Sequence, residues 1–285
     1  MRSKDENTHV IPTDTLYLTI DKEAVRKSGM LMASEDIPDR MVISLKGKRA
    51  LYKGDLMMLE MIANANWTRP IYVATTVGSE NYMNLGDNFI QEGLVNRITP
   101  FTTKAEGMKR FDTEKTYDAV MNRFKFGGVS KKGIYLDETV TRMCYTHRRL
   151  MAQLALELAQ EGKKDKALKV LQKAEKELPT YNVPINYMSG AADMAQAYAL
   201  IGKKQEAVRI LDALWLKSAQ YANWYLSLDG NHFNMSQSDC FMHFQIMMAL
   251  LQASEGISPE WAQKHESQIA ALLDQYRAKG GQMPE

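Results

Sequence analysis

The sequence predicts an α/β domain at residues 11–133, followed by an all-α array of helical hairpins at residues 137–279. In the first part, short runs of β-branched and aromatic residues alternate with segments whose apolar residues recur at helical spacing. In the second part, long segments rich in Ala, Leu and Met are interrupted by glycine and proline. The length of 285 residues is enough for two such domains.

The expected elements of the first part follow the order strand, helix, strand, which indicates one α/β unit. Strands are expected at 15–20, 41–45, 69–77 and around 94–98. Asp55 can cap a helix that stops at Asn64 to Asn66, and Asp112 can cap a second helix that runs to Phe124. The segment from Phe126 to Gly133 is broken by glycines and has no apolar period. We therefore expect it to link the two domains.

The second part contains an internal repeat. When Pro179 is set at the last signature position of a tetratricopeptide repeat of about 34 residues, seven small or apolar residues fall on other characteristic positions: Leu154, Ala155, Leu158, Gly162, Ala167, Leu171 and Ala174. Small residues there let two antiparallel helices approach closely. The stretch Gly202 to Ala207 echoes Gly162 to Ala167, so about six extra residues around Thr180 to Asn186 are expected to loop out. The pattern resembles tetratricopeptide-like helical hairpins.

A third helical pair is expected at 236–254 and 258–279. Ser258, Pro259 and Glu260 supply a cap, a first-turn proline and a carboxylate that favours the helix dipole. Stacked repeats leave an apolar end that has to be covered, and the amphipathic helix at 258–279 can cover it.

Charge and hydropathy argue against two kinds of partner. The chain has 36 basic and 34 acidic side chains and a formal net charge of +2, so it has no overall field to hold a nucleic acid backbone. No stretch approaches the roughly 18 apolar residues that cross a bilayer, so we expect no membrane insertion by this segment. Residues 1–10 lack the apolar region of a secretory signal and are expected to be a polar lead-in within a longer protein.

The pattern Cys-x-x-His occurs twice, at Cys144 and His147 and at Cys240 and His243. On a helix each pair projects from one face, so the two pairs together could clasp zinc. The alternative is that each helix carries a buried cysteine and a polar histidine, which we favour because the pairs lack the usual turn-borne spacing. Neither pair shows the orienting group and oxyanion site that a cysteine nucleophile needs. We expect no catalytic residue, metal or cofactor in this chain.

Candidate binding residues lie in two places. The stretch Gln220 to Phe233 places Tyr221, Trp224, Tyr225, His232 and Phe233 beside several amides, which suits contact with a peptide or a sugar. Its candidate binding residues are Trp224, Tyr225, His232 and Phe233. The same residues can instead fill a core, so both interpretations stay open. In tetratricopeptide repeats the first helix of each hairpin lines a groove, which here includes Arg149 and Gln196. The lysine and asparagine set that clamps a terminal carboxylate in some members of that family is missing.

Four stretches resemble one family: Asp55 to Val77, Phe89 to Phe101, Tyr117 to Gly128 and Tyr135 to Glu138. Trp67, Arg69 and Pro70 are marks of this resemblance. The family is the C-terminal extracytoplasmic region of multi-pass Bacteroidetes membrane proteins similar to protein O-mannosyltransferases, whose N-terminal part is a GT-C-type glycosyltransferase domain. The resemblance implies that the parent protein transfers a sugar from a lipid-linked donor and that its catalytic residues lie outside this chain.

Together these observations predict a non-catalytic accessory domain of a membrane glycosyltransferase. It is expected on the extracytoplasmic, periplasmic face, where its helical repeats contact an acceptor protein or another protein partner. One alternative is a free-standing tetratricopeptide adaptor, which a reading frame without upstream hydrophobic spans would favour. A second alternative is a small-molecule enzyme with its site near Thr75 to Ser79, at the carboxyl edge of the α/β sheet, where open sheets tend to place ligands.

Overall fold

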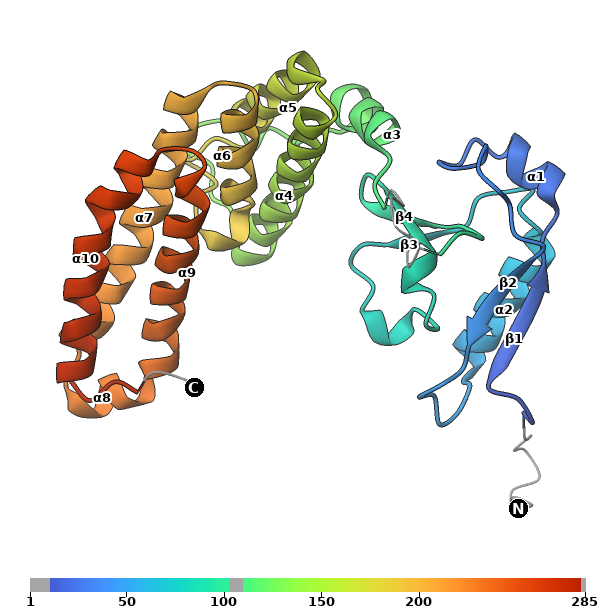
Figure 1. The fold of residues 1–285 in the computed structure, drawn as a ribbon, viewed down its shortest axis with the longest axis horizontal. Coiled ribbons are helices and arrows are strands. Elements are labelled where there is room, and N and C mark those ends of the chain that lie inside the picture. The colour runs from blue at the N-terminus through green and yellow to red at the C-terminus, as the bar shows by residue number, and fades with distance from the viewer. Residues whose placement is uncertain (1–10, 103–109, 283–285) are drawn as a thin grey trace. The chain divides into compact units, whose positions relative to one another are not determined.

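The computed structural model describes residues 11–102 and 110–282 (Figure 1). Its contacts divide the chain into two compact units, Met1–Thr116 and Tyr117–Glu285. The first unit holds two small antiparallel sheets, and the second is helical. None of the described helices has both the length and the apolar character needed to cross a bilayer. The polar lead-in expected at residues 1–10 lies outside the described residues.

The first sheet is an antiparallel pair of β1 (Thr15–Thr19) and β2 (Arg40–Ser44), in which Tyr17 lies opposite Val42. Alternation along β2 puts Met41 and Ile43 in the core, while Tyr17 and Val42 face solvent. α1 (Lys22–Lys27) connects the strands, and the side chain of its N-cap Asp21 accepts a hydrogen bond from the backbone N–H of Ala24 (3.0 Å).

The second sheet contains β3 (Tyr72–Ala74), β4 (Phe89–Glu92) and β5 (Val95–Ile98) in the order β3-β5-β4, and both pairings are antiparallel. Between β3 and β4 lie two short 3-10 turns, η1 (Ser79–Asn81) and η2 (Gly86–Asn88). Gly93, with a φ of 72°, lies in the connection between β4 and β5. The strand expected around 94–98 is therefore one half of a hairpin.

The helix expected after Asp55 is α2 (Lys53–Ala65). Asp55 accepts a hydrogen bond from the backbone N–H of Tyr52 (2.9 Å), so it lies inside the first turn and the helix begins before it. The helix ends where expected, because Asn66 takes a φ of 40°. The strands before and after α2 lie in different sheets, so the single α/β unit expected from the sequence is not formed.

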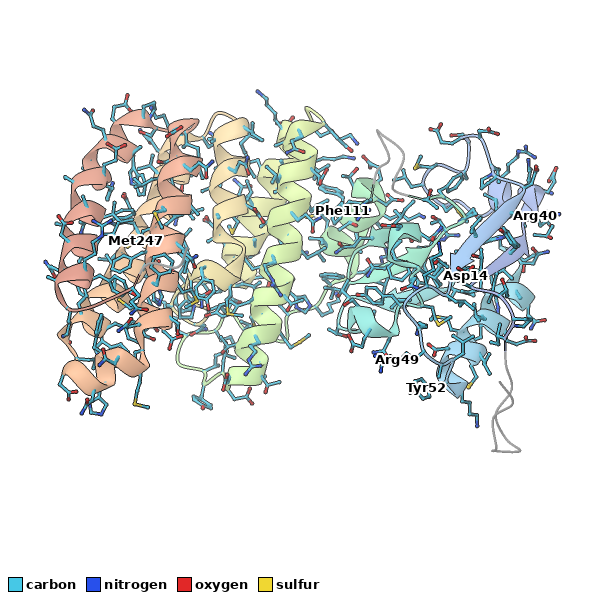
Figure 2. All side chains as sticks on the ribbon, turned by 60° about the horizontal axis from the view of Figure 1, so that its bottom comes forward. Asp14, Arg40, Arg49, Tyr52, Phe111 and Met247 are labelled. Atoms are coloured by element: carbon cyan, nitrogen blue, oxygen red, sulfur yellow. The ribbon has the colours of Figure 1, made fainter. Side chains whose placement is uncertain are left out.

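The helical unit begins within a short α3 (Thr113–Asp118), which is followed by a π-helical turn, η3 (Ala119–Arg123). Asp112 caps α3, as predicted, by accepting from the backbone N–H of Lys115 (2.9 Å). The longer helices are α4 (Glu138–Gln160), α5 (Lys164–Glu177), α6 (Ala191–Leu200), α7 (Lys204–Ser227), α9 (Gln237–Glu255) and α10 (Pro259–Ala278), with a short α8 (Gly230–Met235) after α7. α4 packs on α5 and α6, α6 on α7, α7 on α9, and α9 on α10 (Figure 1). Met247 on α9 is fully buried in this stack (Figure 2).

The turns of the α4–α5 and α6–α7 hairpins have the same geometry. Gly162 and Gly202 take φ values of 78° and 84°, and the backbone N–H of the next residue donates to Leu158 in one turn and to Tyr198 in the other, at 2.8 Å in both. The small residues expected at the helix crossings, Ala155, Ala167 and Ala174, are completely buried. The two hairpins that are similar in sequence thus also have turns of the same structure.

The segment after Thr116 packs with the helices. The rings of Phe124 and Phe126 contact His147 on α4, with centroid distances of 5.7 Å and 5.9 Å. The Asn182 side chain donates to the carbonyls of Val129 and Lys131 (2.6 Å and 2.7 Å). The compact units divide between Thr116 and Tyr117, not at the linker expected at 126–133. The division lies earlier because these contacts attach the glycine-rich segment to the second unit.

α10 closes the other end of the helical stack. Its buried side chains recur at helical spacing and face α9 and α7: Trp261, Ala262, His265, Ile269, Leu272 and Tyr276. Its outward positions carry polar residues such as Gln263, Lys264 and Ser267. A polar outer face on the last helix is what a capping element requires.

Candidate binding surface

One buried arginine fixes the loop at 178–186 between the two hairpins. Arg148 on α4 is 2% exposed, and its guanidinium donates to the backbone carbonyls of Leu178 (2.7 Å), Val183 (2.6 Å) and Pro184 (3.2 Å). Burial lowers the pKa of Arg148 to about 10, so the side chain stays charged at neutral pH. These bonds satisfy carbonyl groups that the loop cannot pair in a helix or a sheet.

The ordered loop leads to a cluster of rings that we call the aromatic surface. It consists of Tyr187 on η4 (Tyr187–Ser189), Tyr221, Trp224 and Tyr225 on α7, and His243 on α9. The His243 ring stacks on Tyr221 with centroids 4.7 Å apart, and lies 6.4 Å from Tyr187 and 6.1 Å from Tyr225. Trp224 packs on Tyr225 at 4.7 Å. Three elements that are far apart in the sequence bring these rings together.

Much of the aromatic surface faces solvent. The exposed fraction is 49% for Tyr187, 40% for Tyr221 and 54% for Trp224. The ammonium group of Lys217 lies 5.0 Å from the centroid of the Tyr221 ring and adds a cation to the edge of the surface. Exposed groups of tyrosine and tryptophan provide large contact areas with polar handles, which suits them to contact with a polypeptide or a sugar.

His243 is the buried member of the aromatic surface. It is 5% exposed, and its Nδ1 has no hydrogen-bond partner within the described residues. The other buried histidine on these helices, His265, pairs its Nδ1 with the carbonyl of Trp261 (2.8 Å). Burial lowers the pKa of His243, and the charge of Asp239 opposes this effect in part. The His243 ring is therefore uncharged at neutral pH where it stacks on Tyr221.

The candidates in the stretch Gln220 to Phe233 differ in whether they pack in the core or are available to a ligand. Phe233 is completely buried and packs against Tyr276 with centroids 5.7 Å apart, so for this residue the core interpretation holds. His232 is exposed and pairs with Asp229 (2.7 Å) at the start of α8. Trp224 and Tyr225 lie on the aromatic surface, where contact with a ligand stays a prediction.

The two predicted groove residues lie on neighbouring helices. Arg149 is exposed on α4, and Gln196 is exposed on α6, which packs on α4. Gly190 precedes α6, and its Cα is so close to α4 that an added Cβ would lie 2.7 Å from the Cα of Arg149. The role of Arg149 and Gln196 in binding a partner stays a prediction.

The two Cys-x-x-His pairs do not come together in the part of the chain that the structure describes. Cys144 is buried on α4, and its neighbour His147 packs against Phe124 and Phe126. Cys240 is buried on α9, where burial raises its pKa to about 11, and His243 belongs to the aromatic surface. Residues 11–102 and 110–282 contain no group of three or more His, Cys, Asp or Glu side chains placed to hold a metal ion.

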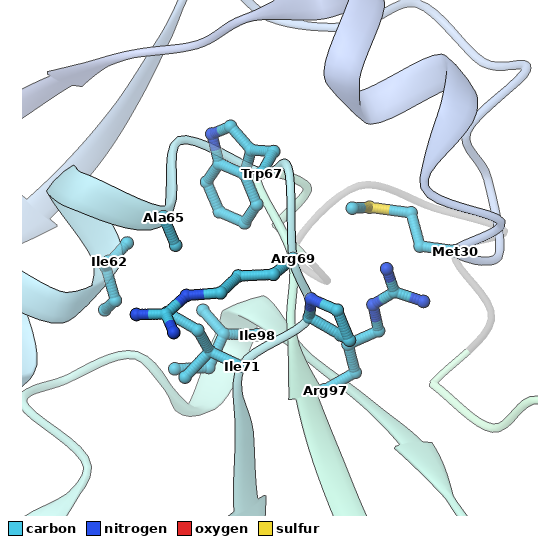
Figure 3. Close-up of a pocket in the computed structure, with 9 residues that line it drawn as sticks. Met30, Ile62, Ala65, Trp67, Arg69, Ile71, Arg97 and Ile98 are labelled. Carbon is cyan, nitrogen blue, oxygen red and sulfur yellow. The ribbon is translucent and has the colours of Figure 1, made fainter.

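The N-terminal unit has a small hollow beside Trp67 (Figure 3). It is lined by Met30, Ile62, Ala65, Trp67, Arg69, Pro70, Ile71, Arg97 and Ile98. Trp67 has a φ of 64°, which is rare for a bulky residue, and its ring is buried. The guanidinium groups of Arg69 and Arg97 point in different directions (Figure 3), so they do not form one anion site. Arg97 instead pairs with Glu92 (3.5 Å) and donates to the carbonyl of Ser28 (3.0 Å).

The rule that suggested a small-molecule site near Thr75 to Ser79 does not apply to this fold. That rule concerns the carboxyl edge of open, mostly parallel sheets. Both sheets of the N-terminal unit are antiparallel, and β3 ends at Ala74 in a three-residue strand. No edge of the expected kind is formed there.

Tyr187 and His243 were not expected among the ligand contacts. A signal for Tyr187 was present, because it directly follows the extra residues in the second repeat, and insertions in repeat proteins often lie on the binding face. His243 was expected to be either a zinc ligand or a polar residue on its helix. Its stacking on Tyr221 could not be expected, because it depends on how α7 and α9 pack.

Comparison with known proteins bears on the N-terminal unit. No curated protein and no solved structure matches the chain. Residues 1–115 match the model of a family described as TMEM260-associated domain 2. The match spans the first compact unit almost completely and is consistent with a domain of a TMEM260-like, protein O-mannosyltransferase-like protein.

Proposed function

We propose that this chain is a non-catalytic accessory region of a TMEM260-like glycosyltransferase and that its helical unit binds a protein partner, most simply the acceptor protein. The family match of residues 1–115 supports the association with such a transferase. The observation that carries the binding role is the aromatic surface, where η4 and α7 present Tyr187, Tyr221 and Trp224 to solvent around the buried ring of His243 on α9.

The helical unit is suited to hold such a surface rigidly. Tyr187 follows a loop that Arg148 anchors, and Tyr221 stacks on the buried ring of His243. A surface whose side chains are already positioned loses little conformational entropy on binding. The repeated turn geometry and the buried alanines support a tetratricopeptide-like interpretation of the two hairpins, a class of fold that offers extended binding surfaces.

The parent is proposed to be a membrane-anchored Bacteroidetes protein that carries this region on its extracytoplasmic, periplasmic side. In that arrangement the membrane domain supplies the chemistry, and the helical unit brings the acceptor close to it. Sugar transfer or sugar hydrolysis by the isolated chain would contradict the non-catalytic part of the proposal.

The binding part is tested by measuring sugar transfer by the parent transferase to its acceptor protein. The double variant Tyr187→Ala/Trp224→Ala is expected to lower transfer by at least about tenfold, since each truncation of a central aromatic contact commonly costs more than about 1 kcal/mol of binding free energy. The matched control is Met235→Ala, because Met235 is 84% exposed on α8 outside the aromatic surface. Unchanged transfer in the double variant, with unchanged thermal unfolding, would show that the acceptor binds elsewhere.

A further inference from the structure

A second exposed surface lies on the N-terminal unit, at the beginning of α2. We call it the α2 tip and define it as Lys46, Arg49, Tyr52, Lys53, Leu56 and Met57. The apolar members are strongly exposed: Tyr52 by 74%, Leu56 by 51% and Met57 by 55%. Arg49 and Tyr52 project outward at the same margin of this unit (Figure 2). Large apolar side chains gathered at one exposed place indicate a contact surface.

Three cations of the α2 tip have no carboxylate partner in the part of the unit that the structure describes. Lys48 forms an ion pair with Asp55 (2.9 Å), and Asp55 also accepts a hydrogen bond from the backbone N–H of Tyr52. The side chains of Lys46, Arg49 and Lys53 have no carboxylate within ion-pair distance among the described residues. The chain from Lys46 to Met57 therefore contains four cations and one acid, a local charge of +3, whereas the whole chain carries +2.

The opposite face of α2 packs against the hydrophobic core of the N-terminal unit. Ile62 and Ala65 are buried, and Met58 and Leu59 pack against the core cluster. One turn beyond the tip, the carboxylate of Glu60 accepts a hydrogen bond from the side chain of Asn64 (2.7 Å), and Met61 is 46% exposed. The exposed apolar character thus continues along the helix, while the unpaired positive charge lies on Lys53 in its first turn and on Lys46 and Arg49 in the segment before it.

We propose that the α2 tip docks on the surface of a lipid bilayer that contains anionic headgroups. An anionic polymer would be held by Lys46, Arg49 and Lys53 but would gain little from exposed Leu56 and Met57. The interface of an anionic bilayer uses both groups, because apolar side chains enter the boundary below the headgroups while cations stay beside the phosphates. Tyr52 adds an amphipathic ring of the kind found at this depth.

The test is co-sedimentation of the full chain with vesicles of phosphatidylcholine alone and with phosphatidylglycerol added. We expect binding only to the anionic vesicles and weaker binding at high salt. Each cation near such a surface contributes about a fivefold factor in the partition coefficient, so Arg49→Gln/Lys53→Gln should weaken binding about 25-fold. Leu56→Ser/Met57→Ser should weaken it at least about tenfold through loss of apolar contact.

Two matched controls separate the tip from general charge and hydrophobicity. Lys164→Gln/Lys169→Gln removes two exposed cations from α5, and Met235→Ser removes an exposed apolar side chain from α8. Both should bind vesicles like the unchanged protein. Circular dichroism and thermal unfolding should be unchanged in all variants, because every substituted side chain is exposed.

Four outcomes would overturn the proposal. The first is no binding to anionic vesicles by the unchanged protein, and the second is binding that the tip variants do not alter. The third is loss of binding in the charge variant but not in Leu56→Ser/Met57→Ser, which would describe a site for an anionic polymer instead. Concentration-dependent self-association that Leu56→Ser/Met57→Ser abolishes would likewise assign the tip to a contact between two copies and overturn the bilayer assignment.

Discussion

Arg148 and Arg149 are neighbours on α4, yet their surroundings differ completely. Arg149 is exposed, whereas Arg148 is almost fully buried and donates hydrogen bonds to three loop carbonyls. Nothing in the local sequence separates the two arginines. The difference arises because the α-helix turns by about 100° per residue, so adjacent side chains face the loop and the solvent respectively.

Arg148→Met should lower the unfolding free energy by about 3 kcal/mol, because the carbonyls of Leu178, Val183 and Pro184 would lose their donor in a buried place. Urea unfolding measures this change, and hydrogen exchange should show that residues 178–186 lose protection first. Arg149→Met is the matched control, and its effect should stay within about 0.5 kcal/mol. Equal effects in the two variants would contradict the role given to Arg148.

His243 predicts a pH dependence of stability. Burial lowers its pKa in the folded protein below the ordinary value of 6.5, so the unfolded chain binds the proton more readily. The stabilising contribution is therefore fully present above about pH 6.5 and is lost as the pH falls toward the folded pKa. Urea unfolding across this range should show the free energy decreasing on acidification.

The control for this prediction is His243→Phe, which keeps an aromatic ring beside Tyr221 but cannot bind a proton. Its unfolding free energy should fall less between neutral and acidic pH than that of the unchanged protein. Parallel pH profiles of the two proteins would show that other groups cause the acid sensitivity.

At the scale of the elements, the helix contact between α4 and α6 depends on Gly190. This residue has a φ of 74°, and an added Cβ would lie 2.7 Å from the Cα and 2.9 Å from the Cγ of Arg149. Gly202 has a similar φ of 84° but open space around it. The two glycines therefore separate the effect of backbone strain from the effect of close packing.

Gly202→Ala should cost about 1 to 2 kcal/mol of unfolding free energy from the left-handed backbone alone. Gly190→Ala should cost the same amount plus about 1 to 3 kcal/mol for the steric conflict with α4. Thermal and urea unfolding of both variants would measure the difference. A Gly190→Ala variant as stable as Gly202→Ala would mean that α6 can move away from α4 without loss.

The helices were more predictable than the sheets, for a physical reason. The bounds of α10 and the turns after Gly162 and Gly202 follow from local signals: helical periodicity, caps and glycine at positive φ. Strand pairing depends on partners that are distant in sequence. The strands around Ile43 and Val73 were expected, but no local feature shows that they belong to different antiparallel sheets.

The candidate binding surface was predictable only in part, for the same reason. Trp224 and Tyr225 were recognised from composition, because they stand in an aromatic stretch on one helix. The exposure of Trp224 and the burial of Phe233 could not be distinguished from the sequence, since both residues fit the same pattern. Tyr187 reaches the surface through the loop that Arg148 holds, which is a tertiary effect.

At the scale of the whole molecule, both ends of the helical stack are covered by the chain itself. α10 closes the C-terminal end with a polar outer face. The segment from Tyr117 to Gly133 attaches to the first hairpin, since Phe124 and Phe126 pack on His147 and Lys173 donates to the carbonyl of Met121 (3.0 Å). An array with two covered ends does not expose apolar surfaces for open-ended stacking.

This arrangement predicts where the helical unit can be cut. A chain of residues 117–285 should unfold cooperatively, whereas a chain of residues 134–285 should be less stable by about 3 kcal/mol, because it loses the fully buried Val120 and the half-buried rings of Phe124 and Phe126. Urea unfolding of the two fragments measures the difference. Phe124→Ala/Phe126→Ala in the full chain should destabilise the helical unit in the same direction. Equal stability of the two fragments would support the expectation from the sequence that the glycine-rich segment is a plain linker, because a linker contributes no packing to the domain that follows it.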